Sequence, residues 1–445
     1  MAFIGIDIGS TSIKGGWLDL RAGEIGDVLS EPFPEPIGGL PAGHFEIDPQ
    51  PVVERVRELI ERLLRRNGPC DGIVTCSQMG GILLADVNGK PATNYLSWRD
   101  QRTLEQHPGG KGTYFDVLRE KTTERDFDAI GRELKPGGGS AVLFWLAENG
   151  KLPSGECRAM GLGDYVLSSL CGTEPVAEAT LALGMVDLSR GEWHRPWFER
   201  LGFGSLDWPK LGSVDAWMGK YPTATGGIPC WPAIGDHQAA LFGTDLAERE
   251  LSVNASTGAQ VSLLTESWKA GDYQTRPYIG GRYLNTITHL PAGRSLNGLV
   301  DLLTALPERA GVNLPDPWGT IRQELERTSR TDLKVDLAFF ASSVGDRGSI
   351  TNVRLENLTV GDLFRSALEN MAKNFSNAAR RLGDSRAWDR VVLSGGICQK
   401  LPLLRELIGE EIPGPQRTVQ TSEETLLGLL KLAKHIEAQQ EGTGR

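Results

Sequence analysis

Near the N-terminus, a carboxylate, three hydroxyl groups and an ammonium group lie close together in the sequence: Asp7, Ser10, Thr11, Ser12 and Lys14. Alternating apolar residues before Asp7 predict a strand, and Gly15 to Leu20 predicts a second strand after the turn. Hydroxyl and N–H groups in such a turn bind phosphate oxygens. Gly9 lets a phosphate approach the backbone because it has no Cβ. We predict a phosphate-binding hairpin with Mg²⁺ at Asp7; the alternative is an ordinary hairpin with a polar turn.

Asp236 is a second carboxylate in a position suited to chemistry. It follows Gly235 and opens a predicted helix in the stretch Gly235-Asp236-His237-Gln238-Ala239-Ala240. A carboxylate at a cleft can act as a general base. The same position suits a residue that only caps the helix, and from the residues alone this alternative stays open.

A second hairpin of similar composition spans Leu251 to Leu264, with Ser256-Thr257-Gly258-Ala259 in its turn. It lies roughly 250 residues after the first hairpin, so it is not a short-period repeat. Two such hairpins indicate a duplicated domain that clasps one nucleotide. Further on, the buried strand Val391 to Leu393 leads into Ser394-Gly395-Gly396 and a helix. Bare glycine backbone at that point suits a base and ribose.

The segment Trp98-Arg99-Asp100-Gln101-Arg102 combines an aromatic ring with two arginines and an acid. Charged side chains can hold hydroxyl groups by charge-assisted hydrogen bonds, and an indole ring can pack against the apolar face of a sugar. We interpret the segment as part of a polyol site. The alternative is a solvated loop with a surface ion pair.

The elements that must position these residues follow from periodicity and turn signals. Asp48 and Pro49 predict the start of a helix, and Gly72 to Ser77 predicts a buried strand. Apolar residues at helical spacing predict a long helix from Gly361 to Leu382. Asp336 to Ala341 is interpreted as a buried strand. Thr421-Ser422-Glu423-Glu424 is a capping-box pattern for the last helix.

Length and composition limit the class of protein. The chain has 445 residues, and we expect two domains, at 1–245 and 246–440. The net charge of −10 argues against a nucleic-acid partner. Six scattered cysteines without a CxxC pair indicate reduced thiols in the cytoplasm, and argue against a zinc site or disulfide framework. We expect no signal peptide and no membrane partner, because the chain enters a strand at once and has no long apolar run.

Taken in order, these stretches resemble the FGGY carbohydrate kinases, which belong to the fold group of actin, the Hsp70 ATPase and hexokinase. Asp7 to Lys14 is similar to the first phosphate loop of the family, and Gly235 to Ala240 to its catalytic-aspartate segment. Ser256 to Ala259 is similar to the second phosphate loop, and Ser394 to Lys400 to the adenosine loop. Arg276 to Leu284 is most similar to sedoheptulokinases, with xylulokinases next. The resemblance implies an α/β, two-domain ribonuclease-H-like fold with ATP in the interdomain cleft.

The resemblance also implies a reaction and its residues. A phosphoryl group would pass from MgATP to a hydroxyl of a ketose such as sedoheptulose or xylulose, with Asp236 as general base and Asp7 and Asp236 holding Mg²⁺. The implied nucleotide contacts are Ser10, Thr11, Ser12, Lys14, Thr257, Gly258, Gly395, Gly396, Gln399 and Lys400. The implied sugar contacts are Gln78, Met79, Trp98, Arg99, Asp236 and His237, with a packed histidine as the alternative for His237.

One position departs from the family pattern. The Gln-Met-His-Gly of xylulokinases reads Gln78-Met79-Gly80-Gly81 here, so the imidazole that would contact a sugar hydroxyl is missing. The substrate therefore stays open, and a glycerol or other polyol kinase is an alternative. A catalytically inactive nucleotide-binding homologue that acts as a scaffold is another. Members of the family often form homodimers, and nothing in this sequence marks an interface.

Overall fold

The computed structural model describes residues 1–110, 112–224, 226–384, 387–419 and 423–442. The first half builds a mixed sheet in the order β13-β14-β5-β1-β2-β3, and β15 also pairs with β5. Its strands are β1 (Ala2–Ile8), β2 (Ser12–Asp19), β3 (Glu24–Pro32), β5 (Gly72–Ser77), β13 (Gly219–Thr223), β14 (Gly226–Cys230) and β15 (Ile234–Gly235). The antiparallel pair β1–β2 confirms the first predicted hairpin, in which Asp7 is the register partner of Lys14.

The second half builds a sheet in the order β18-β19-β17-β16-β22-β23. Its strands are β16 (Glu250–Ala255), β17 (Ala259–Thr265), β18 (Gln274–Tyr278), β19 (Arg282–Leu290), β22 (Arg390–Ser394) and β23 (Gln416–Thr418). The antiparallel pair β16–β17 confirms the second hairpin, and β22 runs parallel to β16 as β5 runs parallel to β1. The central strands of the two sheets therefore share one arrangement, as the duplication predicted.

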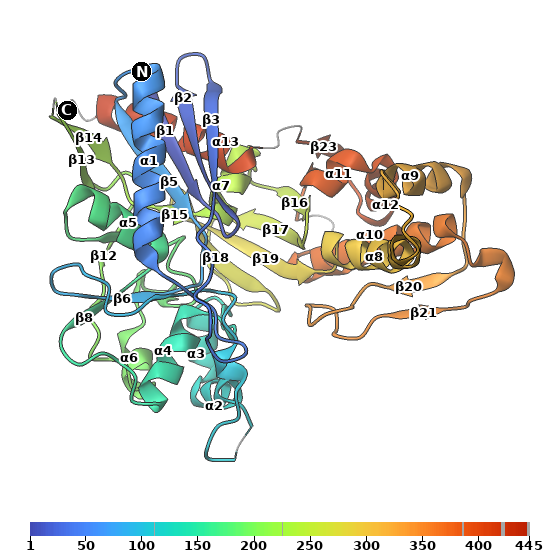
Figure 1. Ribbon diagram of the computed structural model, residues 1–445, viewed down its shortest axis with the longest axis horizontal. Coiled ribbons are helices and arrows are strands. Elements are labelled where there is room, and N and C mark those ends of the chain that lie inside the picture. The colour runs from blue at the N-terminus through green and yellow to red at the C-terminus, as the bar shows by residue number, and fades with distance from the viewer. Residues whose placement is uncertain (111, 225, 385–386, 420–422, 443–445) are drawn as a thin grey trace.

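Helices pack on both sheets, and each sheet with its helices forms one of two lobes (Figure 1). In the first lobe, α1 (Pro49–Asn67) and α5 (Leu162–Cys171) pack on one apolar core of the sheet, and α7 (Asp236–Gly243) and α13 (Glu424–Gly442) belong to another. The second sheet carries α8 (Gly293–Arg309), α9 (Pro317–Arg327), α10 (Val360–Leu382), α11 (Gly396–Lys400) and α12 (Pro402–Glu411). Within the described residues, no helix is both long and apolar enough to cross a membrane.

Helix α13 comes from the end of the chain but lies beside α7 in the first lobe (Figure 1). The two backbones approach closely at Gly428, where a Cβ would lie 1.9 Å from the carbonyl oxygen of Ala239. The chain therefore crosses between the lobes more than once. The predicted domain boundary at 245/246 separates the strands of the two sheets and stays a prediction.

A smaller helical region extends the first lobe. It contains β6 (Leu83–Asp86), α2 (Tyr114–Lys121), α3 (Glu124–Ala129), α4 (Gly139–Glu148), β8 (Cys157–Met160) and α6 (Arg195–Arg200). Trp197 and Trp208 are buried in its core. Short elements complete the fold: β4 (Glu46–Ile47), β7 (Tyr95–Leu96), η1 (Arg102–Leu104), β9 (Val176–Glu178), β10 (Val186–Asp187), β11 (Glu192–Trp193), β12 (Lys210–Gly212), β20 (Lys334–Asp336), β21 (Ser349–Thr351) and η2 (Leu355–Asn357).

Of the local predictions, the helix cap at Asp48 is confirmed and the strand at 336–341 is wrong. Asp48 caps α1 as predicted, since its side chain accepts the N–H of Gln50. The predicted strand at 336–341 is wrong, because β20 ends at Asp336 and side chains take over the backbone bonds beyond it. The N–H of Leu337 donates to Asn370 Oδ1 at 3.2 Å, and its carbonyl accepts from Ser295 Oγ at 2.8 Å. Thr421 and Ser422 of the predicted capping box lie outside the described residues.

Candidate active site

Asp7 and Asp236 lie at the carboxyl ends of β1 and β15, two strands that run parallel to β5 on either side of it. Strand β5 pairs with β1 on one side and with β15 on the other, and Cys76 is the register partner of both Asp7 and Ile234. Asp236 is the first residue of α7, directly after β15, while Gly235 is the N-cap. The alternative that Asp236 only caps the helix is therefore wrong, because Gly235 is the N-cap. Asp236 lies at the same edge of the sheet as Asp7.

The two carboxylates affect each other electrostatically. Burial raises the pKa of Asp236 to about 7, and the negative charge of Asp7 adds to this rise. Burial also raises the pKa of Asp7, even though Thr425 Oγ1 donates a hydrogen bond of 2.7 Å to its Oδ2. Adjacent buried carboxylates with raised pKa values attract a proton or a cation. Two carboxylates could hold Mg²⁺, directly or through water.

Residues at the start of α13 connect the first hairpin to the loop after β22. Glu423 forms an ion pair of 2.8 Å with Lys14 Nζ, and Thr425 donates a hydrogen bond to Asp7. Lys14 and Asp7 both belong to the first lobe. Glu424 accepts the N–H of Gly395 at 3.2 Å in the second lobe. Lys14 on β2 and Gly395 after β22, both predicted for nucleotide binding, are therefore linked through neighbouring residues at 423 and 424. These contacts at 423–425 were not predicted as site contacts.

Each of the two turns is closed by a backbone hydrogen bond between its own residues and lies at least partly at the surface. In the first, the N–H of Gly9 donates to the carbonyl of Ser12 at 3.1 Å; Ser10 is half-buried and Thr11 exposed. In the second, the N–H of Ser256 donates to the carbonyl of Gly258 at 3.0 Å, and Thr257 and Gly258 are exposed. A Cβ on Gly258 would meet no atom within 4 Å, so there is room for a ligand at this backbone.

The loop after β22 requires glycine at its first position. Gly395 has φ +86°, and a Cβ there would lie 2.4 Å from the carbonyl oxygen of Ala255. Gly396 has open space around it. Gln399 donates from Nε2 to the carbonyl of Val419 at 3.1 Å, so its amide supports this loop, and Lys400 is exposed at the end of α11.

The predicted polyol segment divides into an exposed and a buried part. Trp98 is 43% exposed, and the Arg99 guanidinium lies 4.2 Å above the Phe45 ring. Asp100 and Arg102 are buried, and Arg102 Nε donates to Asp100 Oδ1 at 2.9 Å. The alternative of a surface ion pair is therefore wrong. Asp100 and Arg102 hold the loop together, while Trp98 and Arg99 remain free to face a ligand.

The stretch after β5 lies next to both carboxylates. Gln78 is buried and donates from Nε2 to the carbonyl of Gly9 at 3.2 Å, so it supports the first turn. Met79 lies against Gly235, where a Cβ would be 2.4 Å from the Met79 sulfur. Gly80 has φ +88°, a conformation that a histidine adopts only with strain. The backbone conformation therefore disfavours an imidazole at this position.

A buried ionic cluster around His237 is the main feature that the sequence analysis did not find. His237 is 8% exposed, and its Nδ1 accepts a hydrogen bond of 2.9 Å from Arg276 Nη1. Arg276, on β18 of the second sheet, also donates from Nε to Glu133 Oε1 at 2.6 Å. Lys135 Nζ lies 3.4 Å from Glu133 Oε2. Arg276 lies in the stretch that resembles sedoheptulokinases, but no local pattern links it to Glu133, which lies 143 residues earlier.

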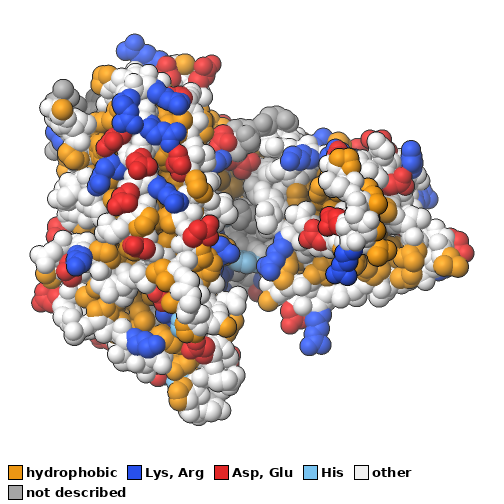
Figure 2. Space-filling model, in the orientation of Figure 1, with side chains coloured by type: hydrophobic (Ala, Val, Ile, Leu, Met, Phe, Trp, Pro, Cys, Tyr) orange, Lys and Arg blue, Asp and Glu red, His pale blue; other side chains and the backbone are white. Residues whose placement is uncertain are grey.

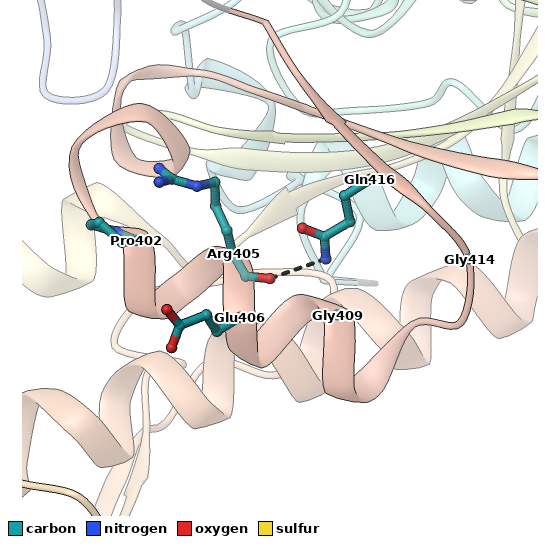
Figure 3. A pocket seen from close by; sticks show the side chains of 6 residues that line it. All are labelled: Pro402, Arg405, Glu406, Gly409, Gly414 and Gln416. Carbon is teal, nitrogen blue, oxygen red and sulfur yellow. Dashed lines mark hydrogen bonds between the residues drawn. The ribbon is translucent and has the colours of Figure 1, made fainter.

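The surface is hollowed between the two lobes, where Lys and Arg side chains lie on both rims (Figure 2). Two cavities lie elsewhere. One, of about 420 Å³, lies between α12 and the segment leading to β23, and Gln416 Nε2 donates there to the Arg405 carbonyl at 3.0 Å (Figure 3). The other, of about 500 Å³, lies between β20, β21, α10 and α12. Neither is lined by a predicted site residue.

Comparison with known proteins gives one family match and several relatives. A family model described as the FGGY family of carbohydrate kinases, N-terminal domain, matches residues 2–243. A glycerol kinase of Saccharolobus islandicus (strain M.14.25 / Kamchatka #1) is 26% identical over 256 residues, which cover 54% of this chain and 48% of that protein. A glycerol kinase of Thermococcus onnurineus (strain NA1) is 25% identical over 287 residues, covering 61% and 55%. The chain thus spans about half the length of the curated relatives it matches.

Solved structures match over nearly the whole chain. The gluconate kinase from Lactobacillus acidophilus superposes with a TM-score of 0.84 at 18% identity, covering 98% of this chain and 89% of that one. The xylulose kinase from Rhodospirillum rubrum gives 0.82 at 19% identity, covering 98% and 90%. These likenesses confirm the predicted two-domain α/β fold.

Proposed function

The chain belongs to the FGGY family of carbohydrate kinases, and on that premise we propose that it transfers a phosphoryl group from ATP to a hydroxyl of a ketose such as sedoheptulose or xylulose. One observation carries the proposal. Asp236, whose pKa is raised to about 7, lies at the carboxyl edge of the first sheet beside Asp7. A carboxylate with a pKa near neutrality is suited to accept the proton of an attacking hydroxyl.

ATP and Mg²⁺ fit the residues that surround Asp236. The paired carboxylates suit the metal ion, and the open backbone at Gly258 and Gly396 leaves space for a nucleotide. Bound MgATP supplies the phosphoryl group and a metal charge that offsets the phosphates. The residues proposed to hold the nucleotide are Ser10, Thr11, Ser12, Lys14, Thr257, Gly258, Gly395, Gly396, Gln399 and Lys400, and those proposed for Mg²⁺ are Asp7 and Asp236.

The residues of the chain divide the work of the reaction. Asp236 accepts the proton of the sugar hydroxyl, for which its carboxylate must come within about 3 Å of that oxygen. Lys14, held by Glu423, and the N–H groups of the two turns offset phosphate charge. Gln78 supports the first turn, while Met79, Trp98, Arg99 and His237 lie on the sugar side. Closure of the lobes excludes water and so limits hydrolysis of ATP.

The raised pKa of Asp236 leads to a pH prediction. Only the carboxylate form accepts a proton, so we expect kcat/KM for the sugar to be low at pH 6 and to rise through about pH 7 to a plateau. The assay is initial rate against pH at sugar concentrations well below KM. A profile that is flat from pH 6 to 8.5 would contradict the assignment of the base.

A coupled ADP-release assay tests the function itself. The panel contains the neutral acceptors sedoheptulose, xylulose, ribulose, erythritol and glycerol and the anionic acceptors gluconate and fructose 6-phosphate, each with and without the protein. Turnover stimulated by a ketose supports the proposal. Turnover with glycerol alone supports the second candidate, a polyol kinase, which the names of the curated relatives favour. ATP binding without stimulation by any acceptor, neutral or anionic, would instead indicate a nucleotide-binding scaffold.

A further inference from the structure

Lys135 carries a loosely held positive charge where the two lobes meet. Its Nζ lies 3.4 Å from Glu133 Oε2 and 3.3 Å from Thr288 Oγ1 of the second sheet. Charge-assisted hydrogen bonds are usually about 2.7–2.9 Å long. Other lysines among the described residues reach that range or less: Lys14 lies 2.8 Å from Glu423, Lys121 lies 2.8 Å from Glu148, and Lys431 lies 2.6 Å from the Gly243 carbonyl. An ammonium group whose contacts within the described residues are both long can take a better partner.

The cluster around Lys135 has more positive than negative charge. Glu133 is shared between Arg276 and Lys135, and Arg276 takes the shorter contact of 2.6 Å. Glu133 thus faces two cations, and the charge of Arg276 also acts on Asp236, so Lys135 is the less compensated of the two cations. His237 accepts a hydrogen bond from Arg276 and so is neutral at Nδ1. Of these groups Glu133 is 1% exposed, whereas the Lys135 side chain is 32% exposed. The uncompensated charge is therefore the one that solvent, or a ligand, can reach.

The position of Lys135 places this charge on the sugar side of the cleft. Its loop packs on the predicted polyol segment: Thr103 Oγ1 donates to the Pro136 carbonyl at 2.9 Å, and a Cβ on Gly137 would lie 2.0 Å from the Trp98 carbonyl oxygen. Across the cleft, Thr288 is followed by His289, whose φ of +59° is a strained conformation of the kind that accumulates at functional sites.

The contacts of Lys135 also separate it from the nucleotide side. The chain Lys135–Glu133–Arg276–His237 ends next to the base Asp236. The residues proposed for nucleotide binding meet instead at 423–425, and within the described part of the chain the hydrogen bonds and ion pairs of Lys135 go to Glu133 and Thr288, not to these residues. The charge of Lys135 is thus linked, through Glu133, Arg276 and His237, to the side of the cleft that carries the proposed base.

We propose that Lys135, with Thr288 and His289, forms a subsite for an anionic group, a carboxylate or phosphate, carried by the acceptor. This rests on the proposed function, since it assigns the subsite to the sugar of that reaction. The acceptor is then a polyol or ketose that bears a carboxylate or a phosphate. Such an anion completes the charge balance of the cluster and binds by a charge-assisted hydrogen bond.

Titration calorimetry without nucleotide tests the subsite. The probes are two matched pairs, gluconate with sorbitol and fructose 6-phosphate with fructose, so that carboxylate and phosphate are separated. We expect the anion of at least one pair to bind about tenfold or more tightly than its neutral partner. Lys135→Met should abolish that difference and leave the neutral partner unchanged, and Lys135→Arg should keep most of it. Lys90→Met, which removes an exposed lysine elsewhere, should behave as the wild type.

Other outcomes overturn the subsite. Equal affinity of anion and neutral partner in both pairs does so without any variant, so the test survives a Lys135→Met protein that fails to fold. A Lys135→Met protein that loses affinity for a non-hydrolysable ATP analogue but not for the anion would assign the charge to the nucleotide instead. Because these measurements involve no phosphoryl transfer, they stand apart from the ADP-release assay, which alone decides the kinase proposal.

Discussion

Asp236→Asn is expected to lower kcat by about 10²–10⁴-fold while the dissociation constant of the sugar changes by less than about threefold. The amide keeps the shape of the side chain and its contact with the N–H of His237, but it cannot accept a proton from the attacking hydroxyl. Steady-state kinetics gives kcat, and titration of the sugar gives its affinity. A variant that retains more than a tenth of wild-type turnover would show that another group is the base.

Asp164→Asn is the matched control for that experiment. Burial raises the pKa of Asp164 to about 8, much as it raises that of Asp236. Asp164, however, accepts the N–H of Gly161 at the start of α5 and lies outside the proposed reaction. Its amide variant should keep kcat near the wild-type value, so a general effect of losing a buried carboxylate is separated from loss of the base.

Thermal unfolding gives Asp236→Asn a second signature. A carboxyl whose folded pKa is about 7, against an ordinary 3.8, binds its proton more tightly in the folded state. The stability that it contributes is present below pH 3.8 and is lost as the pH rises through about 7. At pH 8 the neutral amide avoids this loss, so Tm should exceed that of the wild type. The difference should shrink toward pH 5.

Arg276→Met is expected to reduce the free energy of unfolding by about 3–5 kcal/mol, because it leaves Glu133 buried with only the long contact to Lys135. Burial alone would raise the pKa of Glu133, but the charges of Arg276 and Lys135 hold it at about 2. Without Arg276, the Glu133 carboxylate must either take up a proton or stay charged and poorly paired in the interior, and both destabilise the folded state. Urea unfolding at pH 7 measures the change.

Two further variants sharpen the Arg276 prediction. Glu133→Gln combined with Arg276→Met should recover much of the loss, because no buried carboxylate then lacks a partner. Arg354→Met removes an ion pair with Asp332 in which both side chains are about half exposed, and it should cost less than about 1 kcal/mol. A loss for Arg276→Met as small as that for Arg354→Met would mean that the buried cluster adds little to stability.

The sequence alone led to the hairpins and the main helices, because these depend on local chemistry. Alternating apolar residues and Ser/Thr/Gly turns specify β1–β2 and β16–β17, and parallel strands bring Asp7 and Asp236 to one edge. A prediction from local pattern fails where distant side chains bind the backbone. Asn370 and Ser295 form hydrogen bonds with the N–H and carbonyl of Leu337, so β20 ends earlier than predicted.

Taken by itself, the sequence determined the family, the fold class and the residue types at the two phosphate-type turns, since each is encoded within a short stretch. Only the tertiary structure decided which partner each charge has. It buried Arg102 against Asp100, placed Glu423 on Lys14 across 409 residues, and brought Arg276 to Glu133 and His237. Such pairings depend on how two sheets and a returning helix pack, and Coulomb energy depends on distance and burial rather than on separation along the chain.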